Sequence, residues 1–233
     1  MNKRNIQAVI LAAGESSRFW PFNTTHKSLF KIMGKPIILY TIEGLLSCGI
    51  SNIIVIQGPN KDIESEFKNY SEYSKNIKYV SQNEPKGMGD ALSQAKELLV
   101  EQFLLILAER VDCEEIVRKL NLQIASSKSK TILVGATTDT PSLYGILKIK
   151  NNKVVEIIEK PKKGEEPSNI KALGIYVLTP NFFDIYQNTK KHQYDFEEEE
   201  SLRIIEGTNN LFEFASENDT EREKLYFFDV WNQ

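Results

Sequence analysis

The residues between 14 and 27 carry the side chains best suited to binding a polyphosphate. A continuous apolar segment ends at Gly14, Ser16 and Ser17 keep the next turn small, and Arg18 and Lys27 add two cations. Backbone N–H groups in such a turn can bind phosphate oxygens. Arginine adds a planar charged fork and lysine a compact charge, which can neutralise a departing pyrophosphate. We interpret the turn as a nucleoside triphosphate site, although two solvated surface cations after an ordinary turn would give the same pattern.

Other nucleotide motifs and several protein classes are excluded by the sequence. It contains neither the G-x-G-x-x-G of dinucleotide sites nor the G-x-x-x-x-G-K-[ST] of a P-loop. The net charge of −3 gives no basic field for nucleic acid, and no apolar run approaches the roughly 20 residues of a membrane helix. We interpret the apolar run near the N-terminus as a strand and not as a signal peptide. The two cysteines and two histidines lack zinc-site spacing, and a reducing cytoplasm is the expected location.

The elements that must position the loop alternate between strands and helices. Strands rich in Val and Ile are predicted over residues 6–14, 51–58, 77–82 and 103–109. Helices are predicted over residues 36–50, 61–70 and 89–100. Pro36 suits a first helical position, and Gly49 can end that helix. This alternation predicts an α/β fold with a doubly wound, mainly parallel, Rossmann-like sheet, whose ligands bind at the carboxyl ends of the strands.

The second half of the chain is richer in strands. They are predicted over residues 131–138, 144–150, 154–161 and 171–179, and an aromatic, strand-like segment begins at residue 226. Asn151 and Asn152 tolerate positive φ, which favours a hairpin between the second and third of these strands. We therefore expect antiparallel strands added to the parallel core. One domain would cover residues 1–233, with a nucleotide-binding half at 1–112 and a second half at 113–233.

The opening loop resembles the signature of the sugar-1-phosphate nucleotidylyltransferases. The matching segment reads "LAAGESSRFWPFNTTHKSLFKIMGKP". The residues that match the family pattern are Gly14, Arg18, Pro21, Lys27, Gly34, Lys35 and Pro36. The resemblance implies the fold of nucleotide-diphospho-sugar transferases. It also implies nucleotide contacts from Leu11, Ala12, Ala13, Gly14, Glu15, Ser16 and Ser17. His26 stands where many members have proline, and its "THKSL" context resembles phosphocholine cytidylyltransferases.

A second segment, "QNEPKGMGDAL", resembles the part of the family that recognises the base. The resemblance places Gln82, Gly87, Met88 and Asp90 at the nucleotide. An amide side chain can both donate to and accept from the edge of a base, and glycine allows the backbone to approach a ring closely. Without the resemblance, the segment would be interpreted as an ordinary loop before a helix.

A third segment resembles the sugar-binding half of the family. It contains "YGILKIK", "VVEIIEKP" and "GIY" in the family's order. The resemblance implies sugar contacts from Gly145, Glu159, Asn169, Gly174 and Tyr176, and a contact of Lys160 with the sugar phosphate. A carboxylate suits vicinal hydroxyls and an ammonium suits a phosphate. The alternative is a hairpin strand that ends in a solvated Glu-Lys pair.

Nucleotidyl transfer also implies Mg²⁺, held by one or two carboxylates and bridging phosphate oxygens. The family places one such carboxylate after the fourth strand, where this chain has Glu109, with Asp112 as a competing residue. Asp229 is the candidate for the second ligand. The acidic run at 197–200 is interpreted as a solvated helical face and not as a metal cluster.

Together these motifs predict an enzyme that joins a nucleoside triphosphate and a sugar 1-phosphate. The sugar phosphate would attack the α-phosphorus, so no general base is needed, and Arg18, Lys27 and Lys160 would position and neutralise charge. Three alternatives stay open: a phosphocholine-type cytidylyltransferase, a non-catalytic nucleotide-sugar regulator of the same fold, and a plain interaction module. The sequence does not give the base or the sugar, and it leaves a homo-oligomer open.

Overall fold

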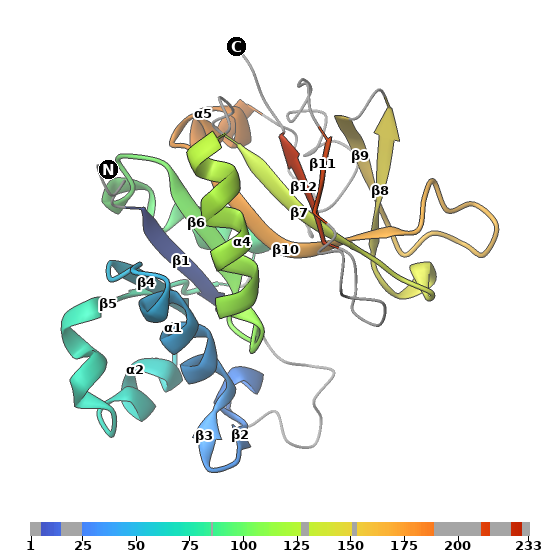
Figure 1. Ribbon diagram of the computed structural model, residues 1–233. Helices are drawn as coiled ribbons and strands as arrows, with labels where there is room; N and C mark the ends of the chain where they lie inside the picture. The colour runs from blue at the N-terminus through green and yellow to red at the C-terminus, as the bar shows by residue number, and fades with distance from the viewer. Residues whose placement is uncertain are drawn as a thin grey trace. The chain divides into compact units, whose positions relative to one another are not determined.

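The computed structural model of the protein describes residues 6–14, 25–84, 86–126, 131–150, 153–188, 211–214 and 225–229 (Figure 1). The chain divides into two compact units, residues 1–122 and 123–233, which we call the first and the second unit. Helix α4, Cys113–Ser126, begins at the division predicted from the sequence, whereas the two compact units divide within this helix.

The first unit is built on four parallel strands. They are β1 Gln7–Ala12, β4 Ile53–Gln57, β5 Ile77–Ser81 and β6 Phe103–Leu107, in the spatial order β6-β1-β4-β5. All of β4 is buried, and so is β1 from Ala8 onward, which is why these segments are apolar except for Gln57 at the end of β4. The register pairs Ala12 with Gln57 and Gln57 with Ser81. The carboxyl ends of β1, β4 and β5 therefore meet at one edge of the sheet.

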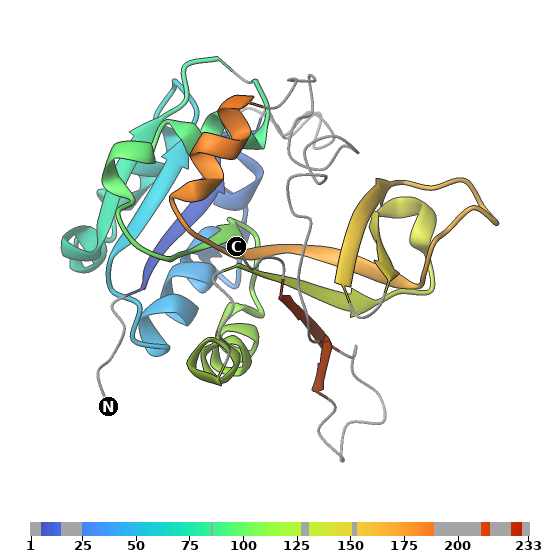
Figure 2. The same cartoon turned by 90° about the horizontal axis from the view of Figure 1, so that it is seen from above.

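Helices cover both faces of this sheet. They are α1 Ile37–Ser47, α2 Asp62–Phe67, α3 Met88–Ser93 and the first turns of α4, with 3-10 turns η2 Lys27–Leu29, η3 Ser71–Asn76 and η4 Lys96–Leu98. α1 lies on one face and α3 on the other (Figures 1 and 2). A Cβ on Gly44 of α1 would lie 2.9 Å from the backbone nitrogen of Glu114 and 3.0 Å from Cβ of Cys113, so glycine lets α1 and α4 approach closely. Residues 89–100, predicted as one helix, form α3 and the separate turn η4.

A short hairpin leads into α1. It consists of β2 Lys31–Ile32 and β3 Lys35–Pro36, joined by Met33 and Gly34 at φ of 51° and 79°. This turn needs positive φ at both central residues, which accounts for the glycine of the G-K-P motif. Pro36, predicted as the first helical residue, is instead the N-cap of α1 at φ −56° and ψ 141°, one position before the first helical residue, Ile37. Gly49, at φ 81°, follows the C-terminus of α1 as predicted.

The second unit is antiparallel. Its strands are β7 Ile132–Thr137, β8 Gly145–Lys150, β9 Lys153–Glu159, β10 Ile170–Leu178, β11 Leu211–Phe214 and β12 Leu225–Asp229. They pair in the order β11-β12-β7-β10, and β8 pairs with β10 and β9. The unit also contains the 3-10 turn η5 Pro141–Leu143 and helix α5 Asn181–Asn188. The predicted β8–β9 hairpin is confirmed, while Asn151 and Asn152 lie outside the described residues.

Strand β10 contains a bulge at the glycine of the G-I-Y segment. The register of β10 against β7 shifts between Ala172 and Tyr176, and Gly174 has φ of 67°. Glycine adopts this backbone with less strain than any residue that has a Cβ, so the bulge favours glycine at this position. Among the described residues, no helix is both long and apolar enough to cross a membrane.

Candidate nucleotide-binding site

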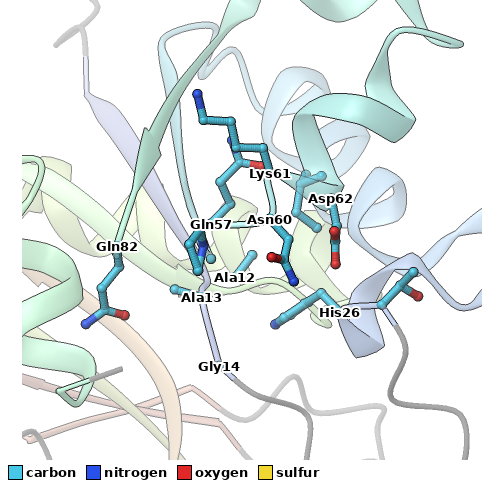
Figure 3. Close-up of a pocket in the computed structure, with 13 residues that line it drawn as sticks. Ala12, Ala13, Gly14, His26, Gln57, Asn60, Lys61, Asp62 and Gln82 are labelled. Carbon is cyan, nitrogen blue, oxygen red and sulfur yellow. The ribbon is translucent and has the colours of Figure 1, made fainter. Parts of the chain in front are cut away.

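The first unit has a pocket of about 290 Å³ at the carboxyl ends of β1, β4 and β5 (Figure 3). The loops after these three strands and the residues before η2 enclose it. Its lining residues are Ala12, Ala13, Gly14, Thr25, His26, Gln57, Gly58, Pro59, Asn60, Lys61, Asp62, Ile63 and Gln82. The position fits the rule that ligands of parallel α/β sheets bind beyond the carboxyl ends of the strands.

The backbone that leaves β1 forms one wall of this pocket. Ala12 is buried, and Ala13 and Gly14 follow it along the lining. A Cβ added to Gly14 would have no atom within 4 Å, so this stretch of backbone stays open to a ligand. Leu11 is buried at the end of β1. Of the other predicted contacts in this loop, Glu15, Ser16, Ser17 and Arg18 lie outside the described residues.

Gln82 lines the pocket with a side chain whose orientation is fixed. Its Nε2 donates to Oδ2 of Asp90 at 2.7 Å and to the carbonyl oxygen of Gly87 at 3.3 Å. Because a carboxylate can only accept, the NH₂ group of Gln82 must face Asp90. The carbonyl Oε1 of this amide is then the atom it offers to a ligand. Gly87 caps α3 at φ 95°, and Met88 begins that helix. Gln82 therefore contacts the start of α3 through Gly87 and Asp90, which belong to the same motif.

The loop after β4 is attached to α2 by a buried glutamine. Gln57 is 1% exposed, its Oε1 accepts from the backbone N–H of Glu64 at 3.0 Å, and its Nε2 donates to Oε2 of Glu64 at 3.1 Å. Lys61, the N-cap of α2, has φ of 56° and makes no side-chain cap. Gln57 therefore supplies the cap from the strand, and it fixes both the loop that carries Asn60 and the start of α2 at Asp62.

His26 presents a neutral imidazole to the same pocket. Its Nδ1 accepts from the backbone N–H of Ser28 at 3.2 Å and lies 2.8 Å from the Ser28 hydroxyl. The backbone bond caps η2 and leaves the ring proton on Nε2. Burial lowers the pKa of His26 from 6.5 to about 4, an effect that the charge of Glu109 partly offsets.

Lys27 and Glu109, predicted as phosphate cation and metal ligand, form an ion pair with each other. Neither residue lines the pocket, and both side chains are partly exposed. Asp112, the competing carboxylate, instead pairs with Nη2 of Arg110 at 2.5 Å.

A metal site is compatible with this arrangement. Among the residues that the structure describes, no three His, Cys, Asp or Glu side chains are grouped to hold a metal. Mg²⁺ at a triphosphate commonly uses one or two carboxylates together with phosphate oxygens and water, and Glu109 alone meets that need. Asp229 ends β12, but its side chain lies outside what the structure describes.

The predicted sugar residues of the second unit gather at the end of the β8–β9 hairpin. Gly145 and Glu159 are register partners, and a Cβ on Gly145 would lie 3.0 Å from Oε2 of Glu159 and 2.9 Å from Cγ2 of Ile157. Lys160, at φ 45°, pairs with Glu159 at 3.1 Å, and its backbone N–H donates to the carbonyl of Tyr144 at 3.0 Å.

The remaining predicted sugar residues belong to β10 and its approach. The carbonyl oxygen of Asn169 accepts from the backbone N–H of Thr138 at 2.8 Å, which fixes the chain before β10. Gly174 forms the bulge described above, and Tyr176 is 3% exposed. Nζ of Lys171 in β10 lies 4.7 Å from the centre of the Tyr144 ring, which precedes Gly145 in the sequence.

Comparison with known proteins identifies the family. The sequence model described as "Nucleotidyl transferase" matches residues 7–231. The chain belongs to the nucleotidyl transferase family. The predicted family, fold class and enzyme class are therefore confirmed.

Two curated relatives and two solved structures resemble this transferase. A UTP–glucose-1-phosphate uridylyltransferase of Staphylococcus saprophyticus is 31% identical over 76% of this chain and 73% of the relative. One from Haloferax volcanii is 28% identical over 87% and 85%. A Bacillus anthracis structure assigned as a glucose-1-phosphate thymidylyltransferase aligns with TM-score 0.66 and 27% identity, covering 79% and 76%. A UDP-glucose pyrophosphorylase solved with UDP-glucose aligns with TM-score 0.64 and 25% identity, covering 79% and 80%.

Several polar residues of the transferase's pocket carried no nucleotide prediction. They include His26, Asn60, Lys61 and Asp62. The sequence marked His26 only as a replacement for proline. The other three precede or begin α2, and a polar loop before a helix gives no sign that it faces a ligand.

Proposed function

We propose that this transferase moves the nucleotidyl group of a uracil or thymine nucleoside triphosphate onto a sugar 1-phosphate. The observation that carries the choice of uracil or thymine over cytosine is the contact of Gln82 with Asp90, which turns Oε1 of the amide toward a ligand. Uracil and thymine present an N3–H donor to such an acceptor, whereas cytosine presents a lone pair at N3. The relatives named above, which act with UTP or form UDP-glucose, support the same choice.

In the proposed reaction, a phosphate oxygen of the sugar 1-phosphate attacks the α-phosphorus of the nucleotide. A new P–O bond forms, the bond between the α-phosphorus and the bridging oxygen breaks, and pyrophosphate leaves. The attacking phosphate is already anionic, so catalysis needs positioning and charge neutralisation but no general base. Arg18 and Lys27 would neutralise the triphosphate, and Lys160 would bind the sugar phosphate.

The ion pair of Lys27 with Glu109 suggests how the two residues divide their roles. A triphosphate offers Lys27 a more highly charged partner than one carboxylate does. Once Lys27 contacts phosphate, Glu109 would be available to Mg²⁺, with Asp229 as the proposed second ligand. The metal would supply charge neutralisation at the phosphate oxygens.

The sugar would bind to the second unit. We assign Glu159 to a pair of vicinal hydroxyls and the backbone of Gly145 to a neighbouring one. Asn169, Gly174 and Tyr176 would complete the site. The pairing of Gly145 with Glu159, in which the glycine leaves room for the carboxylate, supports this assignment.

Pyrophosphate release tests this function. The panel combines UTP, dTTP, CTP, ATP and GTP with several hexose 1-phosphates and with phosphocholine, with and without EDTA. We expect release to be fastest with UTP or dTTP and a hexose 1-phosphate, and to be lost with EDTA. Preference for CTP with phosphocholine would support the cytidylyltransferase alternative, which the relatives do not favour. No release with any pair would leave a non-catalytic nucleotide-sugar regulator.

We also propose a cytoplasmic location. Its support is that Cys48 and Cys113 are both free thiols, as is usual in a reducing compartment.

A further inference from the structure

One end of the nucleotide pocket offers a hydrogen-bond donor and an acceptor that the family motifs do not include. Gln82 lies at one end of the pocket in Figure 3, and Asn60, Asp62 and His26 lie together toward the other. All of these residues line the same cavity. With Gln82 reading the base, this second end is left for another part of the nucleotide.

The donor is Nε2 of His26. Because Nδ1 of the ring accepts from the backbone of Ser28, the ring proton is on Nε2, and the same bond fixes the orientation of the ring. The lowered pKa of His26 keeps the ring uncharged at neutral pH. An uncharged donor can bind an oxygen without drawing the triphosphate away from Arg18 and Lys27.

The acceptor is the carboxylate of Asp62. It belongs to the first residue of α2, and the two hydrogen bonds of Gln57 with Glu64 hold this end of the helix to β4. A carboxylate close to the ring of His26 disfavours a phosphate group at this end of the pocket. A hydroxyl fits both partners, because it can donate to Asp62 and accept from His26 at once.

We propose that His26 and Asp62 bind the ribose hydroxyls of the nucleotide and make the enzyme select ribonucleotides over deoxyribonucleotides. The proposal rests on the proposed function, because it assumes that the base lies at Gln82. It also distinguishes the two nucleotides allowed there by their sugars. UTP carries a ribose and is the preferred substrate, whereas dTTP carries a deoxyribose and is a poor one.

The test compares UTP with 2′-deoxy-UTP and 3′-deoxy-UTP, which share one base. We expect wild-type kcat/KM for UTP to exceed that for at least one deoxy analogue by about tenfold or more. His26→Asn removes the Nε2 donor but keeps a side-chain oxygen that can cap η2. Asp62→Asn keeps the shape and removes the charge. In both variants kcat/KM should fall for UTP and stay nearly unchanged for the discriminated analogue, so that the ratio approaches one.

Two controls separate the proposal from a loss of folding. Glu72→Gln, an exposed acid-to-amide change in η3, should leave the ratio unchanged. Melting temperatures of all variants should stay within a few degrees of wild type. Equal use of all three nucleotides by the wild type would overturn the proposal, and so would an equal loss for all three in His26→Asn.

Calorimetric binding of the same nucleotides keeps this proposal distinct from the proposed function. If UTP binds more tightly than its deoxy analogue but no sugar phosphate yields pyrophosphate, then the ribose site stands and the proposed reaction fails. If pyrophosphate is released but binding and turnover ignore the ribose hydroxyls, then the reaction stands and the ribose site fails.

Discussion

Nε2 of Gln82 donates to Oδ2 of Asp90 at 2.7 Å, across the loop that precedes α3. The family motif contains both residues, and the structure gives them different tasks. Asp90 does not line the pocket, whereas Gln82 does. In the proposed nucleotide site, Asp90 is therefore a positioning residue, which decides whether Gln82 would show an acceptor or a donor to the base.

Replacing Asp90 by asparagine should relax the choice of base. An asparagine can donate as well as accept, so Gln82 could rotate its amide and show NH₂ to the pocket. We expect the preference for UTP over CTP, measured as a ratio of kcat/KM, to fall about tenfold, or about 1.4 kcal/mol. Glu97→Gln, on the exposed side of η4, is the matched control. An equal loss with UTP and CTP would show that Asp90 supports folding and not base selection.

The pair formed by Lys27 and Glu109 calls for a double-mutant cycle. If the residues act on different ligands, Lys27→Met should lower kcat at least about tenfold, on the order of 1.4 kcal/mol. Glu109→Gln should raise the Mg²⁺ concentration needed for half-maximal activity. When activity is measured at one fixed Mg²⁺ concentration, the double variant should lose activity by close to the product of the losses in the two single variants. A double variant no worse than either single variant would mean that the ion pair itself, and not the two separate contacts, supports activity.

Much of the first unit could be predicted because its signals are local. The strands β1, β4 and β6 are mainly apolar runs, and a strand buried on both faces requires that pattern. Strand β5 is only partly buried and includes Lys78 and Ser81. The family pattern marked Gly34 and Gly174 without a conformational reason, and the structure supplies one for each. Gly34 adopts φ of 79° in a tight turn, and Gly174 forms a bulge in β10.

The predictions that failed or were missing depend on contacts between distant segments. The pocket roles of His26 and Asp62 require η2 and the start of α2 to meet, and neither sequence segment contains a sign of the other. Helix α4 was not predicted, although it carries local signals. Glu114 pairs with Arg118 and Glu115 with Lys119, each four residues apart on an exposed face.

Gly145→Ala should weaken sugar phosphate binding selectively. The added methyl group would lie 3.0 Å from Oε2 of Glu159 and 2.9 Å from Cγ2 of Ile157, so the carboxylate must move. We expect KM for the sugar 1-phosphate to rise about tenfold or more, and the free energy of unfolding to fall by about 1–3 kcal/mol from overpacking. KM for the nucleoside triphosphate is the internal control. A parallel rise in both KM values would contradict a role confined to the sugar.

Stability at acidic pH should report the buried state of His26. Its pKa is lowered from 6.5 to about 4, first by burial and then by the charge of Lys27, while Glu109 and Asp62 act in the opposite direction. The unfolded chain therefore binds more protons than the folded chain between these two values, so the free energy of unfolding should fall as pH decreases through that window. His26→Asn lacks this titration and should lose less stability over the same range. Urea unfolding of both proteins between pH 4 and 8 measures the difference, which should be constant above pH 7 and move in favour of the variant toward pH 4. Parallel curves across the whole range would show that His26 has its ordinary pKa in the folded protein. The ring would then be partly charged near pH 6.5, which would contradict the uncharged donor assigned to it.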